Sequence, residues 1–219
     1  MSSTTIVLPV VNVPDLDCML FAFGFASGSV TLTGVGDTVH PWTVRTNNTT
    51  DGTSLWMADC PGGGDLTGKS ITATFGAAAA EKAMYVGAMR GVYAYGGRST
   101  LQVVLFNGVF RNVSNTVAPG NIGDLFLTLF ATTDTADTGF TAVAGMQPIP
   151  AATGPGYWSG TGTGGNFLEG QWMQVPDTAP RAPNGAAGVS SPTGYGAGSF
   201  WYKASPTPAF SPRRMPLVG

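Results

Sequence analysis

The sequence predicts an all-β protein, and three of its features lead to that prediction. The 219 residues include 32 glycines and 16 prolines, which separate short apolar runs along the chain. Several runs alternate apolar with polar side chains, a pattern typical of strands with one buried face. The runs recur at roughly 8 to 14 residues, a spacing typical of antiparallel sandwiches and barrels.

The individual runs justify the expected strands one by one. The first two are rich in β-branched and aromatic residues and are separated by Pro14 and Asp15. In the next two, Val30 and Leu32 alternate with threonines, and Trp42 precedes further alternation. In chain order, we expect strands at residues 4–11, 18–25, 29–37, 40–46, 53–59, 69–76, 82–92, 101–107, 124–133 and 166–175.

Two apolar strands have matching lead-in sequences. Residues 13–23 (VPDLDCMLFAF) and 118–130 (APGNIGDLFLTLF) each run from a proline through a polar turn to an aspartate and then into an apolar strand. Strands without polar alternation are buried on both faces or lie centrally in a covered sheet. We therefore expect these two to be central strands, in equivalent positions of two β-rich halves.

The segment from Gly76 to Arg90 is the only one that also suggests a helix. Its alanines favour a helix, whereas Tyr85, Val86 and the glycines at 87 and 91 do not. We expect a turn followed by a strand.

Charge is scarce, which excludes some partners. Only 10% of the residues are charged and the net charge is -2, whereas soluble domains carry roughly 25% charged residues. There is no basic field for nucleic acid or an anionic membrane. The longest apolar candidate, Cys18–Ala26, is shorter than the roughly 20 residues that span a bilayer. The N-terminus lacks a signal-peptide pattern, so we expect synthesis and retention in a cytoplasm.

Groups suited to catalysis are few. His40 is the single histidine, and Glu81 and Glu169 are the only glutamates beside ten aspartates. Most aspartates stand next to Gly, Pro or Thr, where they cap turns. Cys18 and Cys60 allow at most one disulfide and have no histidine nearby in sequence. We expect no catalytic residues, no cofactor and no enzymatic activity, and whether the two cysteines are bonded stays open.

Three aspartate pairs could offer oxygens to calcium, but their spacing follows no known calcium loop. Turn capping is the expected role of each, and no metal site is predicted. The pairs are Asp15 with Asp17, Asp59 with Asp65, and Asp134 with Asp137.

Residues 145–198 are expected to form long loops rich in glycine and proline, interrupted by the strand at 166–175 that carries Trp172. Tyr157, Trp158 and Tyr195 stand among glycines in these loops, where exposed aromatic rings would be costly. One alternative is that they pack on a neighbouring subunit or on their own sheet. The other is a platform on which sugar rings stack.

The C-terminal residues 211–219 (SPRRMPLVG) place Arg213 and Arg214 between two prolines. Proline prevents regular structure, so we expect an extended tail. An arm that docks on a partner subunit, with the arginines meeting acidic groups, is the corresponding hypothesis.

Taken in order, these segments resemble a jelly-roll β-sandwich module of tailed-bacteriophage virion proteins, prophage tail proteins and bacterial surface proteins. The resemblance spans roughly residues 4–210 and implies one jelly-roll-like antiparallel sandwich over residues 1–210. The similar motifs are a "W-T" strand, a "W-x-A" strand, a glycine-rich turn and a "T-x-T-F" strand, at Trp42–Thr43, Trp56–Ala58, Pro61–Asp65 and Thr72–Phe75.

The resemblance implies a non-enzymatic structural protein of a tailed-phage virion. A minor tail or tail-tip position is expected, with a role in assembly and in attachment to the host surface. The chain is expected to form a homo-oligomer, with a trimer as the first choice, and to contact other virion proteins and a host-surface glycan. The alternatives are a capsid decoration or head-fibre protein and a carbohydrate-binding module with Trp158 or Trp172 exposed in a groove.

Overall fold

The computed structural model describes most of the chain. The described residues are 3–11, 18–50, 52–61, 65–98, 103–106, 109–112, 118–132, 140–141, 145–149, 157–161, 167–181, 185–187 and 195–205. Within these ranges the regular elements are all strands: β1 (Ser3–Val11), β2 (Cys18–Ser27), β3 (Leu32–Gly36), β4 (Thr43–Thr50), β5 (Thr53–Cys60), β6 (Lys69–Ala79), β7 (Lys82–Arg90), β8 (Val92–Arg98), β9 (Val103–Phe106), β10 (Val109–Asn112), β11 (Leu125–Thr132), β12 (Phe140–Thr141), β13 (Gln147–Pro148), β14 (Tyr157–Thr161), β15 (Phe167–Gln174), β16 (Gly185–Ala187) and β17 (Tyr195–Ala204).

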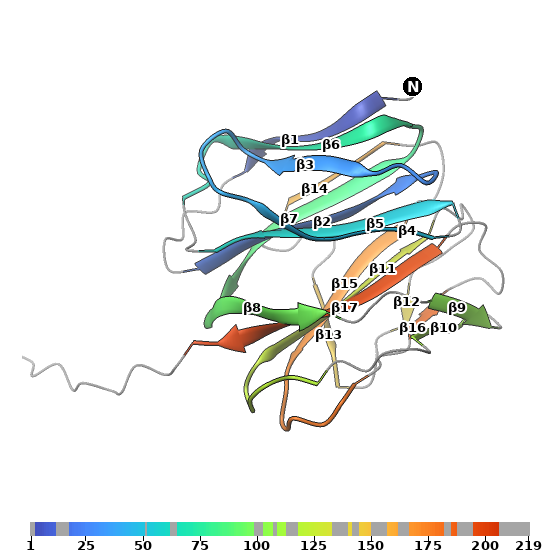
Figure 1. Cartoon of the computed structure of the whole chain (residues 1–219). Coiled ribbons are helices and arrows are strands. Elements are labelled where there is room, and N and C mark those ends of the chain that lie inside the picture. Colours follow the sequence, from blue (N-terminus) through green and yellow to red (C-terminus); the bar gives the residue numbers. More distant parts are fainter. Residues whose placement is uncertain are drawn as a thin grey trace, which may run out of the picture.

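The strands form antiparallel sheets, three of which stack in layers (Figure 1). The outer sheet has the order β1-β6-β3, and the central sheet has the order β14-β7-β2-β5-β4. The third layer, called here the β11 sheet, has the order β13-β15-β11-β17-β8. A small sheet, β12-β16-β10-β9, lies beside the β11 sheet. The all-β prediction is confirmed, with three stacked sheets in place of the two of a simple sandwich.

Strand β2 of the central sheet is buried on both faces, which explains why it lacks polar alternation. In β2, Leu20 and Ala22 pack towards the outer sheet, in a cluster that also contains Ile71 of β6. Phe21 and Phe23 project from the opposite face, in a cluster shared with the β11 sheet. Because successive side chains of a strand point to opposite faces, a strand covered on both sides has buried side chains at every position, and most of them are apolar.

Strand β5 follows the same rule, and all eight of its residues are buried. Trp56 packs in the cluster beneath the outer sheet. Its indole lies over Gly24 of β2, where an added Cβ would stand 2.5 Å from the ring and 2.4 Å from the carbonyl oxygen of Ala83. Glycine at position 24 is therefore required by the close approach of a buried tryptophan.

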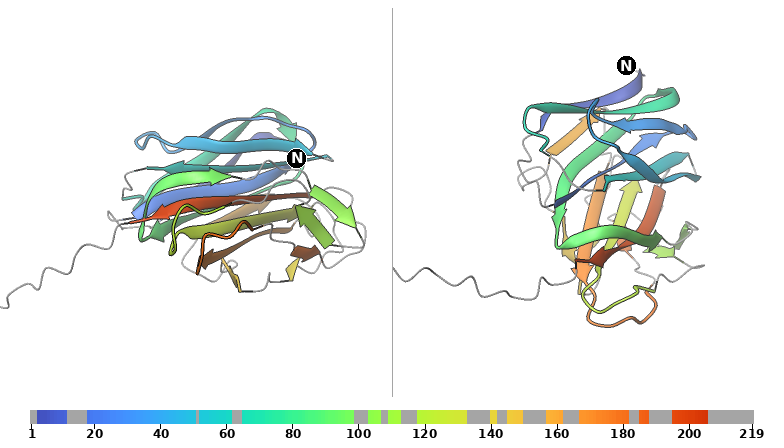
Figure 2. Two further views of the ribbon diagram at one scale, coloured as in Figure 1. Left: turned by 60° about the horizontal axis from the view of Figure 1, so that its bottom comes forward. Right: turned by 60° about the vertical axis from the view of Figure 1, so that its left-hand side comes forward.

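The two strands with matching lead-in sequences occupy matching places. β2 is the third of five strands in the central sheet, and β11 is the third of five in the β11 sheet. The prediction of equivalent central strands is confirmed. The two halves are not separate, however, since β8 of the first half completes the β11 sheet and β14 of the second half completes the central sheet (Figure 2).

The segment from Gly76 to Arg90 contains the end of β6 and all of β7, joined by a short turn that passes from the outer sheet to the central sheet, so the preference for a strand over a helix was correct. The alanines at 77–79 end β6, and β7 begins at Lys82. Lys82 is buried, and its Nζ donates to the carbonyl oxygen of Ser3 at 3.1 Å and to that of Ala79. Burial lowers the pKa of the Lys82 ammonium. This lysine ties the start of β1 to the connection between β6 and β7.

Candidate functional site

A pocket of about 510 Å³ opens between the central sheet and the β11 sheet. It lies where the edge strands are short. β14 pairs with β7 only from Lys82 to Val86, so β7 extends beyond it to Arg90. On the facing sheet, β13 contributes only Gln147 and Pro148 to the pairing with β15. The sheets are therefore less closely joined at this edge than at their centres.

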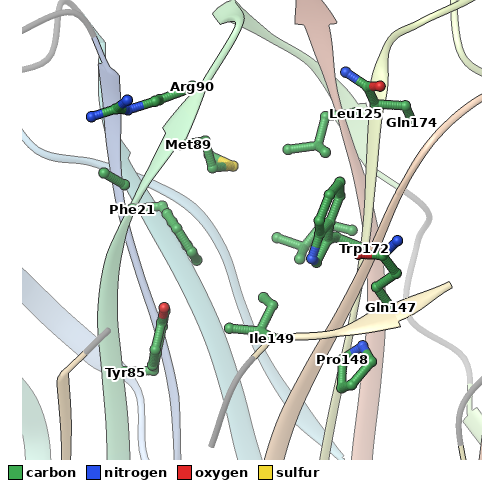
Figure 3. Close-up of a pocket in the computed structure, with 12 residues that line it drawn as sticks. Phe21, Tyr85, Met89, Arg90, Leu125, Gln147, Pro148, Ile149, Trp172 and Gln174 are labelled. Atoms are coloured by element: carbon green, nitrogen blue, oxygen red, sulfur yellow. The ribbon is translucent and has the colours of Figure 1, made fainter. Parts of the chain in front are cut away.

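The pocket has two walls that face each other (Figure 3). On one wall, Phe21, Tyr85 and Met89 are buried at their positions on β2 and β7. The other wall consists of side chains from β11, β13, β15 and the residue after β13. These are Leu125, Leu127, Gln147, Pro148, Ile149, Trp172 and Gln174.

The floor of the pocket is aromatic and apolar. The Tyr85 ring centroid lies 5.5 Å from that of Phe21 and 5.1 Å from that of Phe23. Burial raises the pKa of Tyr85 to about 12. Gly87 leaves space for this packing, because a Cβ there would lie 2.8 Å from the Tyr85 hydroxyl.

Polar groups surround the rim of the pocket. Gln147, Gln174 and Arg90 are exposed, whereas Trp172 is half-buried against the apolar cluster. Amide groups donate and accept hydrogen bonds, and a half-buried indole offers an apolar surface. The pocket thus suits a ligand with apolar or planar parts inside and hydrogen-bonding groups at the rim.

A buried polar network joins the same two sheets elsewhere. The Asp59 carboxylate of β5 is fully buried and accepts from Arg45 Nε at 2.8 Å and Arg45 Nη2 at 2.9 Å. The Tyr202 hydroxyl of β17 donates to Asp59 Oδ2 at 2.9 Å. The Arg45 guanidinium lies 4.6 Å from the centroid of the Tyr95 ring. Satisfied buried charges of this kind fix the register of the parts that they join.

Burial, together with the negative charge of Asp59, raises the pKa of Tyr202 well above its ordinary value. The hydrogen bond to Asp59 raises the pKa of Arg45. The network therefore holds a charged arginine, a carboxylate and a neutral phenol. These groups contact one another, as in a structural contact between two sheets.

His40 lies in the turn before β4, which begins at Thr43 rather than at residue 40 as expected. Asp37 Oδ2 stands 2.7 Å from His40 Nδ1, and Asp37 Oδ1 accepts from the His40 N–H at 2.9 Å and from Trp42 Nε1 at 3.3 Å. Burial acts to raise the pKa of Asp37, but the hydrogen bonds and charge of His40 and the N–H of Val39 lower it overall. This Asp–His pair organises the turn before β4.

Cys60 is buried in the apolar cluster beneath the outer sheet. Burial raises the pKa of its thiol, and the charges of Asp37 and Asp59 act in the same direction. A thiol needs a lowered pKa to act as a nucleophile at neutral pH. Cys60 is thus a packing residue, whereas the side chain of Cys18 lies outside the described part of the chain.

The aspartates within the described ranges act mainly in turns and networks. Asp65 accepts from the Thr67 N–H at 2.7 Å, as the turn-capping prediction requires. Asp124 is buried and accepts from the N–H groups of Asn121 and Ala204, each at 2.9 Å. Asp59 is the exception, since it belongs to the buried network. Asp15, Asp17, Asp134 and Asp137 lie outside the described residues.

Of the predicted site residues, the structure places Trp172 in the pocket. The expectation that Tyr157, Trp158 and Tyr195 lie in loops was wrong, since the first two belong to β14 and the third begins β17. β14 pairs with β7, where Trp158 stands opposite Tyr85. The five residues of β14 carry no local signal of this long-range pairing. The side chains of these three aromatics lie outside the described part, as do Arg213, Arg214 and residues 206–219.

Sequence reasoning missed the contribution of β7 and β13 to the pocket. Phe21 and Tyr85 were expected only as strand residues, and Gln147 and Pro148 as loop residues. Their convergence depends on how two sheets meet, for which the sequence gives no local signal. Arg45 and Asp59 were missed as partners for the same reason.

Among the described residues, no group of three or more His, Cys, Asp or Glu side chains is arranged to hold a metal ion. The same ranges contain no helix with the length and apolarity to cross a lipid bilayer. Comparisons with protein-family models, with curated proteins and with solved structures found no significant match to this chain.

Proposed function

We propose that this chain is a non-enzymatic structural protein of a tailed-bacteriophage virion, built as a jelly-roll-like module that assembles with further copies of itself. A minor tail or tail-tip position, with a role in assembly and host attachment, is the preferred place in the particle. The observation that carries the proposal is an uncharged face on the outer sheet, which is exposed at Thr5 and Val7 and half-buried at Thr72 and Thr74.

This face, called here the hydroxyl face, consists of residues in register across three strands. Val7 of β1, Thr72 of β6 and Gly36 of β3 form one row. Thr5, Thr74 and Gly34 form the next row. Val7 is 43% exposed, and none of these side chains carries a charge.

An uncharged face supports association between copies of one chain. In a two-fold assembly, the same surface of each copy meets itself across the axis, so like charges there would repel. Hydroxyl groups both donate and accept hydrogen bonds, and interface cores are depleted of charged residues. A threonine-rich sheet face can thus pack against its copy without unpaired charge.

The test is the mass of the purified chain in solution, measured by light scattering after size exclusion. We expect an oligomer for the native chain and dissociation for Thr72→Lys, which would place a lysine from each copy in the interface. The matched control is Ile122→Lys, because Ile122 is 71% exposed and lies away from the hydroxyl face. A monomeric native chain, or dissociation by both variants equally, would contradict the proposal.

The place in the particle needs its own measurement. An antibody against the chain, visualised on intact virions by electron microscopy, should label the tail tip. Labelling of the head would favour the capsid decoration or head-fibre alternative, and particles without label would argue against a virion role.

A carbohydrate-binding module is a second candidate, and the pocket supports it. Trp172 offers an indole surface beside the rim amides of Gln147 and Gln174, a combination suited to the face and edge of a sugar ring. On a glycan array, binding that Trp172→Ala removes and Trp172→Phe retains would favour this role. Binding that only Trp158→Ala removes would move the site to β14.

A further inference from the structure

We propose that the pocket binds the proline-rich segment 206–210 of the same chain, with Phe210 as its apolar anchor. This inference goes beyond the virion role and does not depend on it. It rests on the point where the described chain ends, on the lining of the pocket and on the composition of the segment.

The described chain ends beside the pocket. The N–H of Ser205 donates to the carbonyl oxygen of Gly91 at 2.8 Å, and Gly91 directly follows the lining residue Arg90. Figure 3 shows Arg90 and Gln174 at one end of the pocket and Tyr85 at the other. Residue 206 therefore directly follows Ser205, which is hydrogen-bonded to the residue next to Arg90 at this end of the pocket.

The length of the segment matches the pocket. Extended proline-rich chain advances about 3.1 Å per residue, so Phe210 can lie roughly 15 Å from Ser205. Along β7, the five steps from Arg90 back to Tyr85 cover about 16 Å at the rise of a β-strand. Phe210 can thus reach the aromatic floor if the chain turns into the pocket after Ser205.

The composition of the segment suits the lining. Residues 206–210 read PTPAF, and proline-rich chain in the extended conformation docks in grooves lined by aromatic rings. Phe21, Tyr85 and Trp172 supply such rings. Proline has no N–H, so the segment mainly offers carbonyl oxygens, and the amide N–H groups of Gln147 and Gln174 can donate to them.

The same features rank a peptide above a sugar inside the pocket. Hydroxyl groups of a saccharide would face Phe21, Leu127 and Ile149 and would lose hydrogen bonds to water there. An apolar anchor such as Phe210 has no such requirement. The pocket lining contains no aspartate or glutamate, so Arg213 and Arg214 have no acidic partner in it.

Proximity favours the same chain as the donor. A short tether gives a segment an effective concentration on the order of millimolar at a nearby site. A second copy would need a comparable concentration in solution to compete. The tail expected to reach a partner subunit would then first dock on its own body.

Disulfide trapping in the full chain tests the proposal. Gln147 lines the pocket and is exposed, and it stands opposite Trp172 in the pairing of β13 with β15, so the pair Gln147→Cys and Ala209→Cys places one thiol at the pocket and one beside Phe210. The control pair is Ala78→Cys and Ala209→Cys, because Ala78 is exposed on β6 of the outer sheet. Every variant also carries Cys18→Ser, since Cys18 pairs with Arg90 beside the pocket.

Under mild oxidation, we expect the Gln147 pair to form an intramolecular disulfide at least tenfold faster than the Ala78 pair. Adding Phe210→Ser to the Gln147 pair should slow the reaction at least fivefold. Equal rates for the two pairs, or no effect of Phe210→Ser, would overturn the proposal. Dimers linked through Gln147→Cys and Ala209→Cys would overturn the same-chain assignment. The mass of the unoxidised chain tests assembly separately, so the two proposals can fail independently.

Discussion

Replacing Tyr202 by Phe removes one hydroxyl from the buried network between the central sheet and the β11 sheet. The lost bond is the 2.9 Å contact from the Tyr202 hydroxyl to Asp59 Oδ2, and both residues are fully buried. A hydrogen bond to a charged group contributes about 1.5–3 kcal/mol. The carboxylate keeps its two bonds from Arg45, so the loss should stay within this range rather than reach that of an unpaired charge.

The measurement is urea-induced unfolding of the native chain and of Tyr202→Phe. We expect the free energy of unfolding to fall by about 1.5–3 kcal/mol with an unchanged slope against urea, which corresponds to a roughly 10- to 150-fold change in the unfolding equilibrium. Tyr93→Phe is the matched control, because Tyr93 is 53% exposed, and it should change stability by less than about 0.5 kcal/mol.

The result that refutes this reasoning is a loss below about 0.5 kcal/mol for Tyr202→Phe, equal to that of the control. Such a result would mean that the hydrogen bond from Tyr202 to Asp59 stabilises the folded chain no more than hydrogen bonds to water stabilise the unfolded chain. Arg45→Met extends the test, since it leaves the Asp59 carboxylate without a cation and should cost about 3–5 kcal/mol.

Three other predictions concern stability. Gly24→Ala should lower the free energy of unfolding in urea by about 1–3 kcal/mol or more, because the added Cβ would meet a backbone oxygen at 2.4 Å. The control Gly34→Ala should be near neutral, because an added Cβ there would have nothing within 4 Å. The pKa of Tyr85 is about 12 in the folded chain, above the ordinary value near 10. The neutral phenol therefore stabilises the fold fully below pH 10, and this stabilisation is lost between about pH 10 and 12. Tyr85→Phe should flatten that part of the stability curve, and an unchanged alkaline slope would contradict it. Because the pKa of Asp37 is lowered in the folded chain, this carboxylate stabilises the fold at pH values above the ordinary pKa of an aspartate. The stabilisation is lost as the pH falls below that value, so Asp37→Asn should weaken the acid dependence of the melting temperature.

Ten of the strands, β1 to β7, β9, β11 and β15, could be predicted because each carries its own signal. The apolar run of β2 and the alternation in β6 (KSITATFG) depend only on which faces are covered, and local sequence reports this directly. The central positions of β2 and β11 followed from the same property. β8 was not predicted because its sequence VYAYGGR has two glycines before its last residue, and such glycines suggest a turn.

The pocket could not be predicted, because it depends on where strands end relative to strands far away in the chain. Only the pairing of β14 with β7 shows that the edge at Arg90 is uncovered by β14, and only the stacking of two sheets brings Trp172 towards Phe21. Neither relation leaves a periodic trace in the sequence. The sequence marked Trp172 as a candidate contact because it is an aromatic residue, but only the tertiary structure shows that it lines the pocket.

The exchange of β8 and β14 between the two halves has a consequence for synthesis. The central sheet lacks its edge strand until residues 157–161 have been made, and β8 has no strand to pair with in the β11 sheet until β17 appears at residues 195–204. These two sheets are therefore complete only when nearly the whole chain has been made, and contacts of such long sequence separation form slowly. A nascent chain of this kind exposes open strand edges for longer than a protein that completes one sheet before the next.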